Sequence, residues 1–231
     1  ALPANGDGLA VLNADDKWYP ELRGRTRATV IRVGIENFAD IRASDIKING
    51  DVKFRLNIAK KREDVIVRLR TLGRHQIYNA LQAAAVGYMQ GMDLDEIREG
   101  LETMEFPDMR MQQIERAGIR FVNDCYNANV VSMKAALQMI AETPCRGRKI
   151  AVLGEMLELG EHSRQAHLDM GGLAAQSGAA LLVAVGEHGK LIADGAVNRG
   201  MEAHRVLPVT DAVQAADLLR WLLRDGDFVL L

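Results

Sequence analysis

Apolar and polar positions follow two different patterns along the chain, and the pattern changes near residue 107. Before that point, short apolar segments lead into a region, residues 41–70, in which apolar and polar residues alternate. After it, continuous apolar segments take turns with segments whose apolar residues recur at helical spacing. Continuous apolar strands are buried on both faces, so the second pattern predicts a mostly parallel sheet covered by helices on both sides.

Residues 1–106 predict a mixed sheet with helices. The strings LAVLNADD and ATVIRVGI indicate two strands, and the alternating region predicts antiparallel strands with one face in water. The dipeptide Asn49-Gly50 lies between the first two alternating segments and is a strong hairpin signal. One helix is expected in the string GRHQIYNALQAAAV, and another begins at Asp93, which has the spacing of a capping box with Glu96.

Residues 107–231 predict a Rossmann-like, doubly wound domain. Pro107 disfavours a helical residue before it, and we place the domain boundary there. The expected strands span 119–122, 149–153, 180–185, 205–209 and 228–231, and the expected helices span 131–142, 163–176, 189–198 and 211–223. Such sheets bind ligands outside the carboxyl ends of their strands, so the turns NDCYNAN and LGEMLELGEHS are the expected sites of chemistry.

The composition argues against several classes of partner. The chain has 29 Lys and Arg residues and 31 Asp and Glu residues, and neither sign dominates a long run. It therefore lacks the basic surface typical of proteins that bind nucleic acids or anionic membranes. Its apolar runs are too short to span a bilayer. Cys125 and Cys145 have neither disulfide nor metal-ligand spacing, which fits buried thiols in a reducing cytoplasm.

Both ends of the chain indicate a fragment. The first residue is Ala1 rather than Met, and the last five, DFVLL, have the composition of a buried strand that stops on an apolar residue. We therefore expect further segments of the protein beyond these 231 residues.

The first of the two turns favours a nucleotide. Asp124 could accept hydrogen bonds from the hydroxyls of a ribose, Tyr126 could stack on a base, and an Asn amide could match the edge of that base. The helix that follows offers free N–H groups and the positive end of its dipole to a phosphate. An alternative stays open, because Asp124 or Asn129 could simply cap this helix.

The second turn combines two carboxylates with two histidines: Glu155, Glu158, His162 and His167. Such a set could hold a metal ion, or its charges could be solvated in a loop. Met156 and Leu159 stand where a dinucleotide fingerprint starting at Gly154 would need glycine, which argues against a nicotinamide or flavin oxidoreductase. No G-x-x-x-x-G-K-[ST] string occurs, so these residues cannot cradle a triphosphate with a P-loop.

Three further polar residues are candidates for ligand contacts. Arg110 follows the expected domain boundary, and its planar guanidinium could clamp a phosphate between the two domains. A solvent-facing charge at a hinge is the alternative. His75 and Asn79 are four residues apart on one face of the expected helix, where they could contact a ligand or serve as a helix cap and a satisfied polar contact.

In chain order, four strings resemble successive segments of the Mur ligases: GRHQIYNALQAAAV, PDMRMQ, NDCYNANVVSMKAAL and VLGEMLELGEHS. These are ATP-dependent, amide-forming ligases of peptidoglycan synthesis. The Tyr-Asn-Ala-Asn and Leu-Glu-Leu-Gly strings are most similar to members that add D-alanyl-D-alanine to UDP-N-acetylmuramoyl-tripeptide. The resemblance implies an α/β fold, with the end of the central ATP-binding domain at 1–106 and the Rossmann-like carboxyl-terminal domain at 107–231.

The resemblance also implies roles for individual residues. Arg110 would be the catalytic clamp on phosphate, Asn79 would meet the adenine, Asp124 would hold the ribose, and Tyr126 and Asn127 would lie beside the base. A second group would lie near the incoming dipeptide or the domain closure: Asn129, Glu158 and His167. Two residues depart from the family pattern, since Val130 replaces a usual Pro and Glu155 a usual Asp.

The family mechanism passes through an acyl phosphate that the amine of D-alanyl-D-alanine attacks. The cofactors implied are ATP and Mg²⁺, but the family's P-loop, carbamylated lysine and most metal ligands would lie upstream of Ala1. The resemblance implies a cytoplasmic, monomeric enzyme of which this chain is an inactive fragment. Two alternatives stay open: a related Mur or folylpolyglutamate-type ligase with another amino-acid donor, and a non-catalytic nucleotide-binding module.

Overall fold

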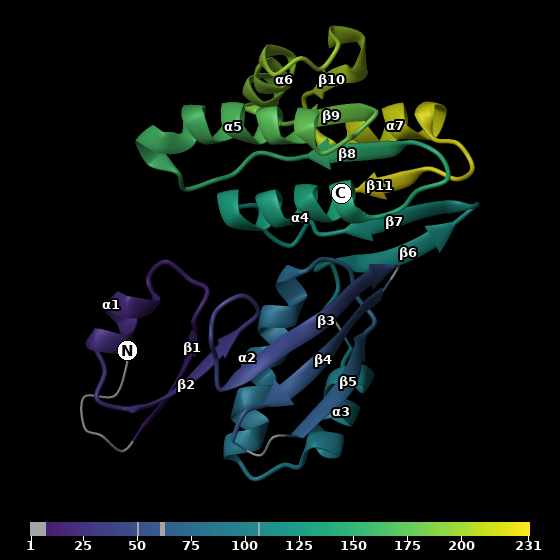
Figure 1. The fold of residues 1–231 in the computed structure, drawn as a ribbon. Helices are drawn as coiled ribbons and strands as arrows, with labels where there is room; N and C mark the ends of the chain where they lie inside the picture. Colours follow the sequence, from purple (N-terminus) through teal and green to yellow (C-terminus); the bar gives the residue numbers. More distant parts are fainter. Residues whose placement is uncertain (1–7, 50, 61–62, 106) are drawn as a thin grey trace. The chain divides into compact units, whose positions relative to one another are not determined.

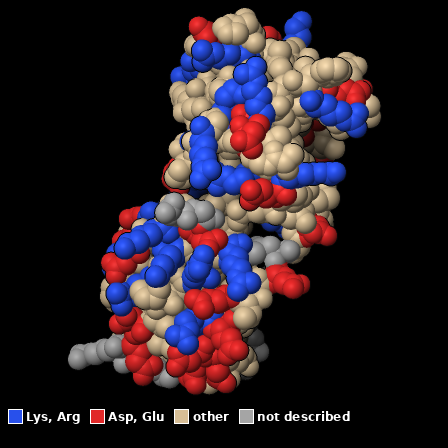
Figure 2. All heavy atoms as spheres, turned by 90° about the vertical axis from the view of Figure 1, so that its right-hand side faces the viewer, with Lys and Arg blue, Asp and Glu red and all other residues tan. Residues whose placement is uncertain are grey.

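The computed structural model describes residues 8–49, 51–60, 63–105 and 107–231. The chain divides into two units, Ala1–Glu105 and Phe106–Leu231, and each unit has its own sheet (Figure 1). None of the helices in the described residues is long and apolar enough to cross a membrane. On the face drawn in Figure 2, basic and acidic side chains are interspersed, as expected from nearly balanced numbers of the two.

The first unit contains a five-stranded mixed sheet in the order β1-β2-β3-β4-β5. Its strands are β1 (Leu9–Asn13), β2 (Thr29–Gly34), β3 (Ile41–Asn49), β4 (Asp51–Ile58) and β5 (Glu63–Leu69). The first three are parallel neighbours, and β4 is antiparallel to both β3 and β5. Every second residue of β4 is buried, which confirms the predicted antiparallel strands with one wet face. Gly50 of the expected hairpin lies outside the described residues.

The helices of the first unit are α1 (Tyr19–Gly24), α2 (His75–Met89) and α3 (Leu94–Thr103). Ile77, Leu81 and Ala84 of α2 belong to the core beneath the sheet. The predicted capping box of α3 is confirmed, because Asp93 accepts the N–H of Glu96 at 2.8 Å and the Glu96 carboxylate accepts the N–H of Asp93 at 2.8 Å. Helix α1 was not expected from the sequence and buries none of its residues.

The second unit contains a six-stranded sheet in the order β10-β9-β8-β11-β7-β6. Its strands are β6 (Gln112–Arg116), β7 (Ile119–Asn123), β8 (Lys149–Leu153), β9 (Leu181–Val185), β10 (Val206–Val209) and β11 (Phe228–Leu230). All neighbours are parallel except β6 and β7, which form a hairpin. This sheet confirms the predicted Rossmann-like, mostly parallel domain. Strand β6 was missed because most of its side chains are polar and exposed.

Four helices cover this sheet: α4 (Val130–Glu142), α5 (Ser163–Gln176), α6 (Gly189–Asn198) and α7 (Ala212–Leu222). Parallel crossovers are right-handed, so α4, α5 and α6, which carry the chain in one direction along the sheet, share a face. Helix α7 returns the chain and lies on the other face, where Ala215 and Leu219 pack on Val183 and Val229.

Helices α5 and α6 meet at glycines. A Cβ atom on Gly171 would lie 1.9 Å from the carbonyl oxygen of Ile192, and one on Gly195 would lie 2.0 Å from the carbonyl oxygen of Leu168. Both distances are far below van der Waals contact, so the two backbones touch only because these positions lack side chains.

Candidate functional site

The loop before β6 folds back onto the turn that follows β7. Asp124 accepts the N–H of Met111 at 3.0 Å, and the N–H of Tyr126 donates to the carbonyl oxygen of Met109 at 3.1 Å. Between these two contacts, the guanidinium carbon of Arg110 lies 4.0 Å from the centroid of the Tyr126 ring, which is a cation–π contact. The structure therefore brings together Arg110, Asp124 and Tyr126, three of the residues proposed from the sequence.

The backbone on both sides of Arg110 is strained. Met109 and Met111 have φ values of 60° and 51°, in the left-handed region that costs an ordinary residue about 1–2 kcal/mol. The Gln112 amide oxygen accepts the N–H of Met109 at 3.3 Å, and the buried Met111 side chain anchors the other end of the loop. Strain of this kind persists where the surroundings enforce it and is concentrated at functional sites.

Asp124 carries a carboxylate in a half-buried position. Burial raises the pKa of Asp124, while the hydrogen bond from Met111 and the charge of Arg110 oppose this rise without cancelling it. The arrangement leaves the carboxylate with one hydrogen bond from the protein among the described residues. It is therefore able to accept further hydrogen bonds from a ligand.

A cavity of about 690 Å³ opens at the carboxyl ends of β7, β8, β9 and β11. Most of its lining is apolar, from strand ends and from helices α4 and α7. The charged and polar side chains of its lining are Asp124, Asn127, Ser132, Glu155 and Arg220. Arg110 and Tyr126 are not among the described lining residues, but their loop is bonded to Asp124, which does line the cavity.

Asn129 is the N-cap of helix α4. Its side-chain oxygen accepts the N–H groups of Val131 at 3.0 Å and Ser132 at 2.9 Å, and the Ser132 hydroxyl accepts the N–H of Asn129 at 3.2 Å. This is the capping interpretation that the sequence left open, with Asn129 rather than Asp124 as the cap. The proposed contact of Asn129 with a substrate has to come from the part of the amide that the cap leaves free.

The second turn gathers a histidine pair and a carboxylate. His167 is fully buried; its Nε2 accepts the N–H of Met156 at 2.9 Å, and its Nδ1 donates to the carbonyl oxygen of Ser163 at 2.7 Å. The His188 ring stacks on it with 4.7 Å between centroids. His188 Nδ1 and the His188 N–H both donate to Glu155 Oε2, at 2.9 and 3.3 Å.

These contacts show which side chains of the second turn are free to meet a ligand. His167 cannot touch a ligand in this arrangement, since its ring is buried and both nitrogens are bonded, whereas Glu158 is exposed and has a left-handed backbone with φ of 62°. His188 was missed from the sequence. The available signal was its place in the turn GEHG, at the carboxyl end of the next parallel strand. No group of three potential metal ligands occurs in the described parts of the chain.

In the first unit, the start of helix α2 holds two further residues proposed from the sequence, His75 and Asn79. The Gln76 amide links them, donating to His75 Nε2 at 3.2 Å and accepting from the Asn79 amide at 2.9 Å. Burial lowers the pKa of His75. Asn79 is exposed, and its carbonyl oxygen remains available to a ligand.

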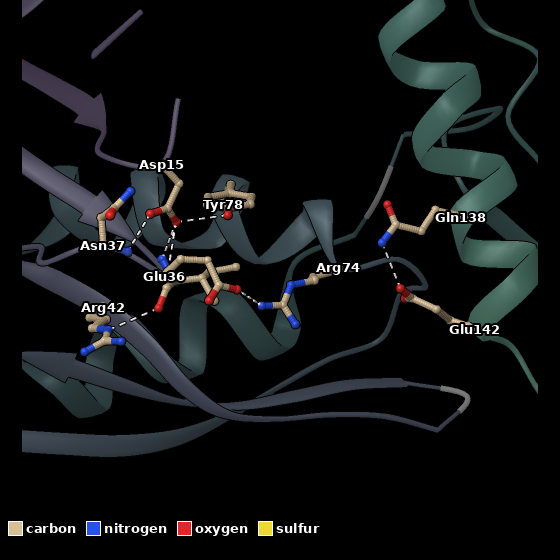
Figure 3. A network of polar contacts seen from close by, with 9 residues as sticks. Asp15, Glu36, Asn37, Arg42, Arg74, Tyr78, Gln138 and Glu142 are labelled. Atoms are coloured by element: carbon tan, nitrogen blue, oxygen red, sulfur yellow. Dashed lines mark hydrogen bonds and ion pairs between the residues drawn. The ribbon is translucent and has the colours of Figure 1, made fainter. Parts of the chain in front are cut away.

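A hydrogen-bond network around Asp15 was not anticipated from the sequence (Figure 3). The Asp15 carboxylate accepts the N–H groups of Ile35 at 2.6 Å, Glu36 at 3.1 Å and Asn37 at 2.7 Å, and the hydroxyl of Tyr78 at 3.0 Å. It thereby ties the end of β1 to the loop after β2 and to α2. Arg74 pairs with Glu36 in the same network.

The Asp15 network shifts two pKa values. Burial works to raise the pKa of Asp15, but the three backbone N–H groups and Tyr78 outweigh it, so the pKa lies below its usual value. Burial and the hydrogen bond to Asp15 raise the pKa of Tyr78 to about 12. Asp15 is therefore a charged structural tie within the first unit.

Two family models match the chain. Residues 109–231 match the glutamate ligase domain of Mur ligases, and residues 2–87 match the Mur ligase middle domain.

Among named relatives, the UDP-N-acetylmuramoyl-tripeptide–D-alanyl-D-alanine ligase of Mycobacterium tuberculosis strain H37Rv is 34% identical over 243 residues, which cover 96% of this chain and 48% of that protein. The ligase of the same name from Escherichia coli K12 is 34% identical over 196 residues, which cover 83% of this chain and 42% of that protein. The chain therefore spans about half the length of these relatives.

A solved structure has the same fold. MurF from Acinetobacter baumannii superposes on the chain with a TM-score of 0.82 at 26% identity, covering 96% of this chain and 48% of that one.

Proposed function

The chain belongs to the Mur ligase family, and we propose that it is part of a ligase that adds D-alanyl-D-alanine to UDP-N-acetylmuramoyl-tripeptide. One observation carries this proposal: relatives that bear the name of this single activity match 96% of the chain in Mycobacterium tuberculosis and 83% in Escherichia coli. The proposed enzyme is monomeric, works in the cytoplasm and acts in peptidoglycan biosynthesis.

In this proposal the two parts of the chain have different tasks. Residues 1–106 are the carboxyl-terminal part of the central ATP-binding domain, and residues 107–231 are the carboxyl-terminal domain; the matches to residues 2–87 and 109–231 support this division. The chain contains no P-loop string. The triphosphate-binding loop of the proposed enzyme is therefore supplied outside these residues.

The proposed reaction has two stages. ATP first transfers its γ-phosphoryl group to the carboxylate of the tripeptide, which gives ADP and an acyl phosphate. The amine of D-alanyl-D-alanine then attacks the acyl carbon, and the tetrahedral intermediate collapses to the amide as phosphate leaves and the amine loses its proton. Positive groups stabilise the charge that develops on the transferred phosphoryl group.

Five residues of this chain are proposed to bind ATP. Asp124 holds the ribose through its free hydrogen-bonding capacity, Tyr126 and Asn127 lie beside the base, and Asn79 offers its amide to the adenine. Arg110 donates two parallel N–H bonds to phosphate, which its planar fork permits. Since the guanidinium stacks on Tyr126 in the structure, we propose that ATP draws it away from the ring.

Mg²⁺ is proposed to act in the complete enzyme. No group of three His, Cys, Asp or Glu side chains gathers among the described residues, and most ligands of the ion are proposed to lie outside this chain. The side chains of this chain are therefore proposed to contact the nucleotide and the incoming amine rather than the metal ion. Asn129 and Glu158 stay proposed as neighbours of the dipeptide, and His167 is proposed to act there only through the loop that it holds.

The proposal is tested by competition between amine substrates. The protein used is a complete ligase, in which this chain follows the upstream segment that carries the P-loop. ADP release is measured with UDP-N-acetylmuramoyl-tripeptide and one of several amines, and we expect turnover with D-alanyl-D-alanine but none with glutamate, lysine or diaminopimelate. Turnover with one of the other amines in its place would contradict the proposal. The 231 residues by themselves are expected to release no ADP above background.

A further inference from the structure

The cavity at the strand ends has two carboxylates of different character. Asp124 is next to the Arg110 guanidinium and is already assigned to the ribose. Glu155 lies at the end of β8, lines the same cavity and pairs with His188, whose Nδ1 lies 2.9 Å from Glu155 Oε2. Because Glu155 lies at the wall of a mostly apolar cavity, its carboxylate attracts a cationic ligand that enters this cavity.

One oxygen of Glu155 is available. Both hydrogen bonds from His188 end on Oε2, and within the described parts of the chain nothing donates to Oε1. The hydrogen bond from the His188 ring is the main reason why the pKa of Glu155 lies below its usual value. The side chain therefore stays ionised near neutral pH. Such a carboxylate suits an ion pair with an ammonium group better than it suits the role of a base that takes a proton from this group.

The orientation of Glu155 is set by residues behind it. His188 donates hydrogen bonds to Glu155 Oε2 from its ring Nδ1 and from its backbone N–H. The His188 ring also stacks on the His167 ring, with 4.7 Å between the two centroids. His167 is itself immobilised by Met156 and Ser163. A carboxylate held by such a chain of contacts loses little side-chain freedom when it binds a ligand.

The rest of the cavity suits apolar groups. Its lining combines small side chains such as Ala128 and Ala136 with larger ones such as Leu219 and Leu231. Arg220 is the guanidinium of the described lining, and its exposed ion pair with Asp217 is the kind that contributes little. A short peptide with methyl side chains, an ammonium group at one end and a carboxylate at the other matches these features.

We infer that Glu155 binds the ammonium group of the dipeptide substrate through Oε1 and that His188 positions this carboxylate. The inference rests on the proposed function, because it assumes that an amino-acid amine enters this cavity. Glu155 is a binding residue, His188 is a positioning residue that acts through it, and His167 supports His188.

The test uses steady-state kinetics of the complete ligase, in which this chain follows the upstream segment that carries the P-loop. Glu155→Gln removes the charge and keeps the shape, and it is expected to raise KM for D-alanyl-D-alanine about 10-fold to 100-fold, the range for one charge-assisted hydrogen bond. KM for ATP is expected to change less than about two-fold, because the nucleotide contacts are untouched. His188→Phe keeps the stacked ring but loses the Nδ1 donor, and a smaller rise in the same KM is expected.

The control is Glu161→Gln, which removes a carboxylate that is 89% exposed and close in sequence. It is expected to leave both KM values unchanged. A second probe avoids any folding defect of the variants: D-lactoyl-D-alanine, in which a hydroxyl replaces the ammonium group, is expected to inhibit the wild type at least about 10-fold more weakly than the dipeptide binds.

The outcomes separate the two proposals. A dipeptide KM that is the same in wild type and Glu155→Gln, or equally strong binding of D-lactoyl-D-alanine, would overturn the role of Glu155 while leaving the ligase proposal intact. Absence of ligation in the wild type would overturn both.

Discussion

The guanidinium carbon of Arg110 lies 4.0 Å from the centroid of the Tyr126 ring, and the backbone holds this pair from both sides. Met109 and Met111 place Arg110 by their left-handed conformations, and Tyr126 is tied to the same loop through its N–H. One residue proposed to bind phosphate therefore rests on another proposed to lie beside the base. Binding of ATP and the loss of this stack are expected to be coupled.

Replacing Arg110 by Lys tests the phosphate clamp. The charge is kept, but the planar fork that donates two parallel bonds is lost, so kcat of the ligase is expected to fall about 10-fold to 100-fold. KM for D-alanyl-D-alanine is expected to stay constant. The matched control is Arg116→Lys, on the exposed strand β6, which is expected to change neither constant. Equal kcat values for Arg110→Lys and the wild type would remove Arg110 from the reaction.

Replacing Asp124 by Ala tests the ribose contact. The ligand hydroxyls and the Met111 N–H would lose their acceptor, and ADP is expected to bind more weakly by about 1–3 kcal/mol. Calorimetric titration of the ligase with ADP measures this difference. Asp169→Asn, on the exposed side of α5, serves as the control and is expected to bind ADP like the wild type. An unchanged affinity in Asp124→Ala would exclude the carboxylate from the nucleotide site.

Replacement of glycine by alanine is expected to have opposite effects at two helical positions, one at the contact between α5 and α6 and one in open space on α3. Gly195→Ala would place a methyl group 2.0 Å from the Leu168 carbonyl oxygen, and the free energy of unfolding is expected to fall by about 1–3 kcal/mol or more. Gly100→Ala in α3 meets nothing within 4 Å and is expected to add up to about 1 kcal/mol.

Urea unfolding of both glycine variants, followed by circular dichroism, measures the two effects. A neutral Gly195→Ala substitution would mean that the helices are farther apart than described.

The contact between Tyr78 and Asp15 predicts a loss of stability in alkali. The pKa of Tyr78 is about 12 in the folded state and about 10 in the unfolded state, so its contribution is complete below pH 10. As pH rises from 10 to 12, the unfolded state releases the Tyr proton first, and the contribution is lost.

The control for this alkaline effect is Tyr78→Phe, which lacks the titrating group. The free energy of unfolding of the wild type is expected to decline more steeply than that of the variant over this pH range. Parallel pH profiles for the two proteins would contradict the raised pKa.

The sequence predicted the second unit better than the first. Helices 163–176 and 189–198 have the bounds expected from their apolar spacing, because each lies between buried parallel strands that leave little choice of register. Strand β6 and helix α1 were missed because neither has a run of buried residues for a pattern to reveal. The meander of β3, β4 and β5 was predictable because one of its faces is wet.

The site was predictable in part. Turn position identified Asp124, Tyr126 and Glu155, since strand ends meet at one edge of a parallel sheet. It could not identify the pairing of Glu155 with His188, 33 positions later in the chain, because strand order decides which turns become neighbours. Asp15 was hidden for the same reason, as its partners come from the loop after β2 and from α2.

We propose that this chain serves an ATP-dependent D-alanyl-D-alanine ligase, with the nucleotide at Asp124. The most direct measurement is mass spectrometry of the product that the complete ligase forms from ATP, UDP-N-acetylmuramoyl-tripeptide and D-alanyl-D-alanine. We expect the wild type to form UDP-N-acetylmuramoyl-pentapeptide and Asp124→Ala to form much less of it at limiting ATP. A wild-type enzyme that leaves the tripeptide unchanged, or an Asp124→Ala variant that forms pentapeptide at the wild-type rate, would contradict it.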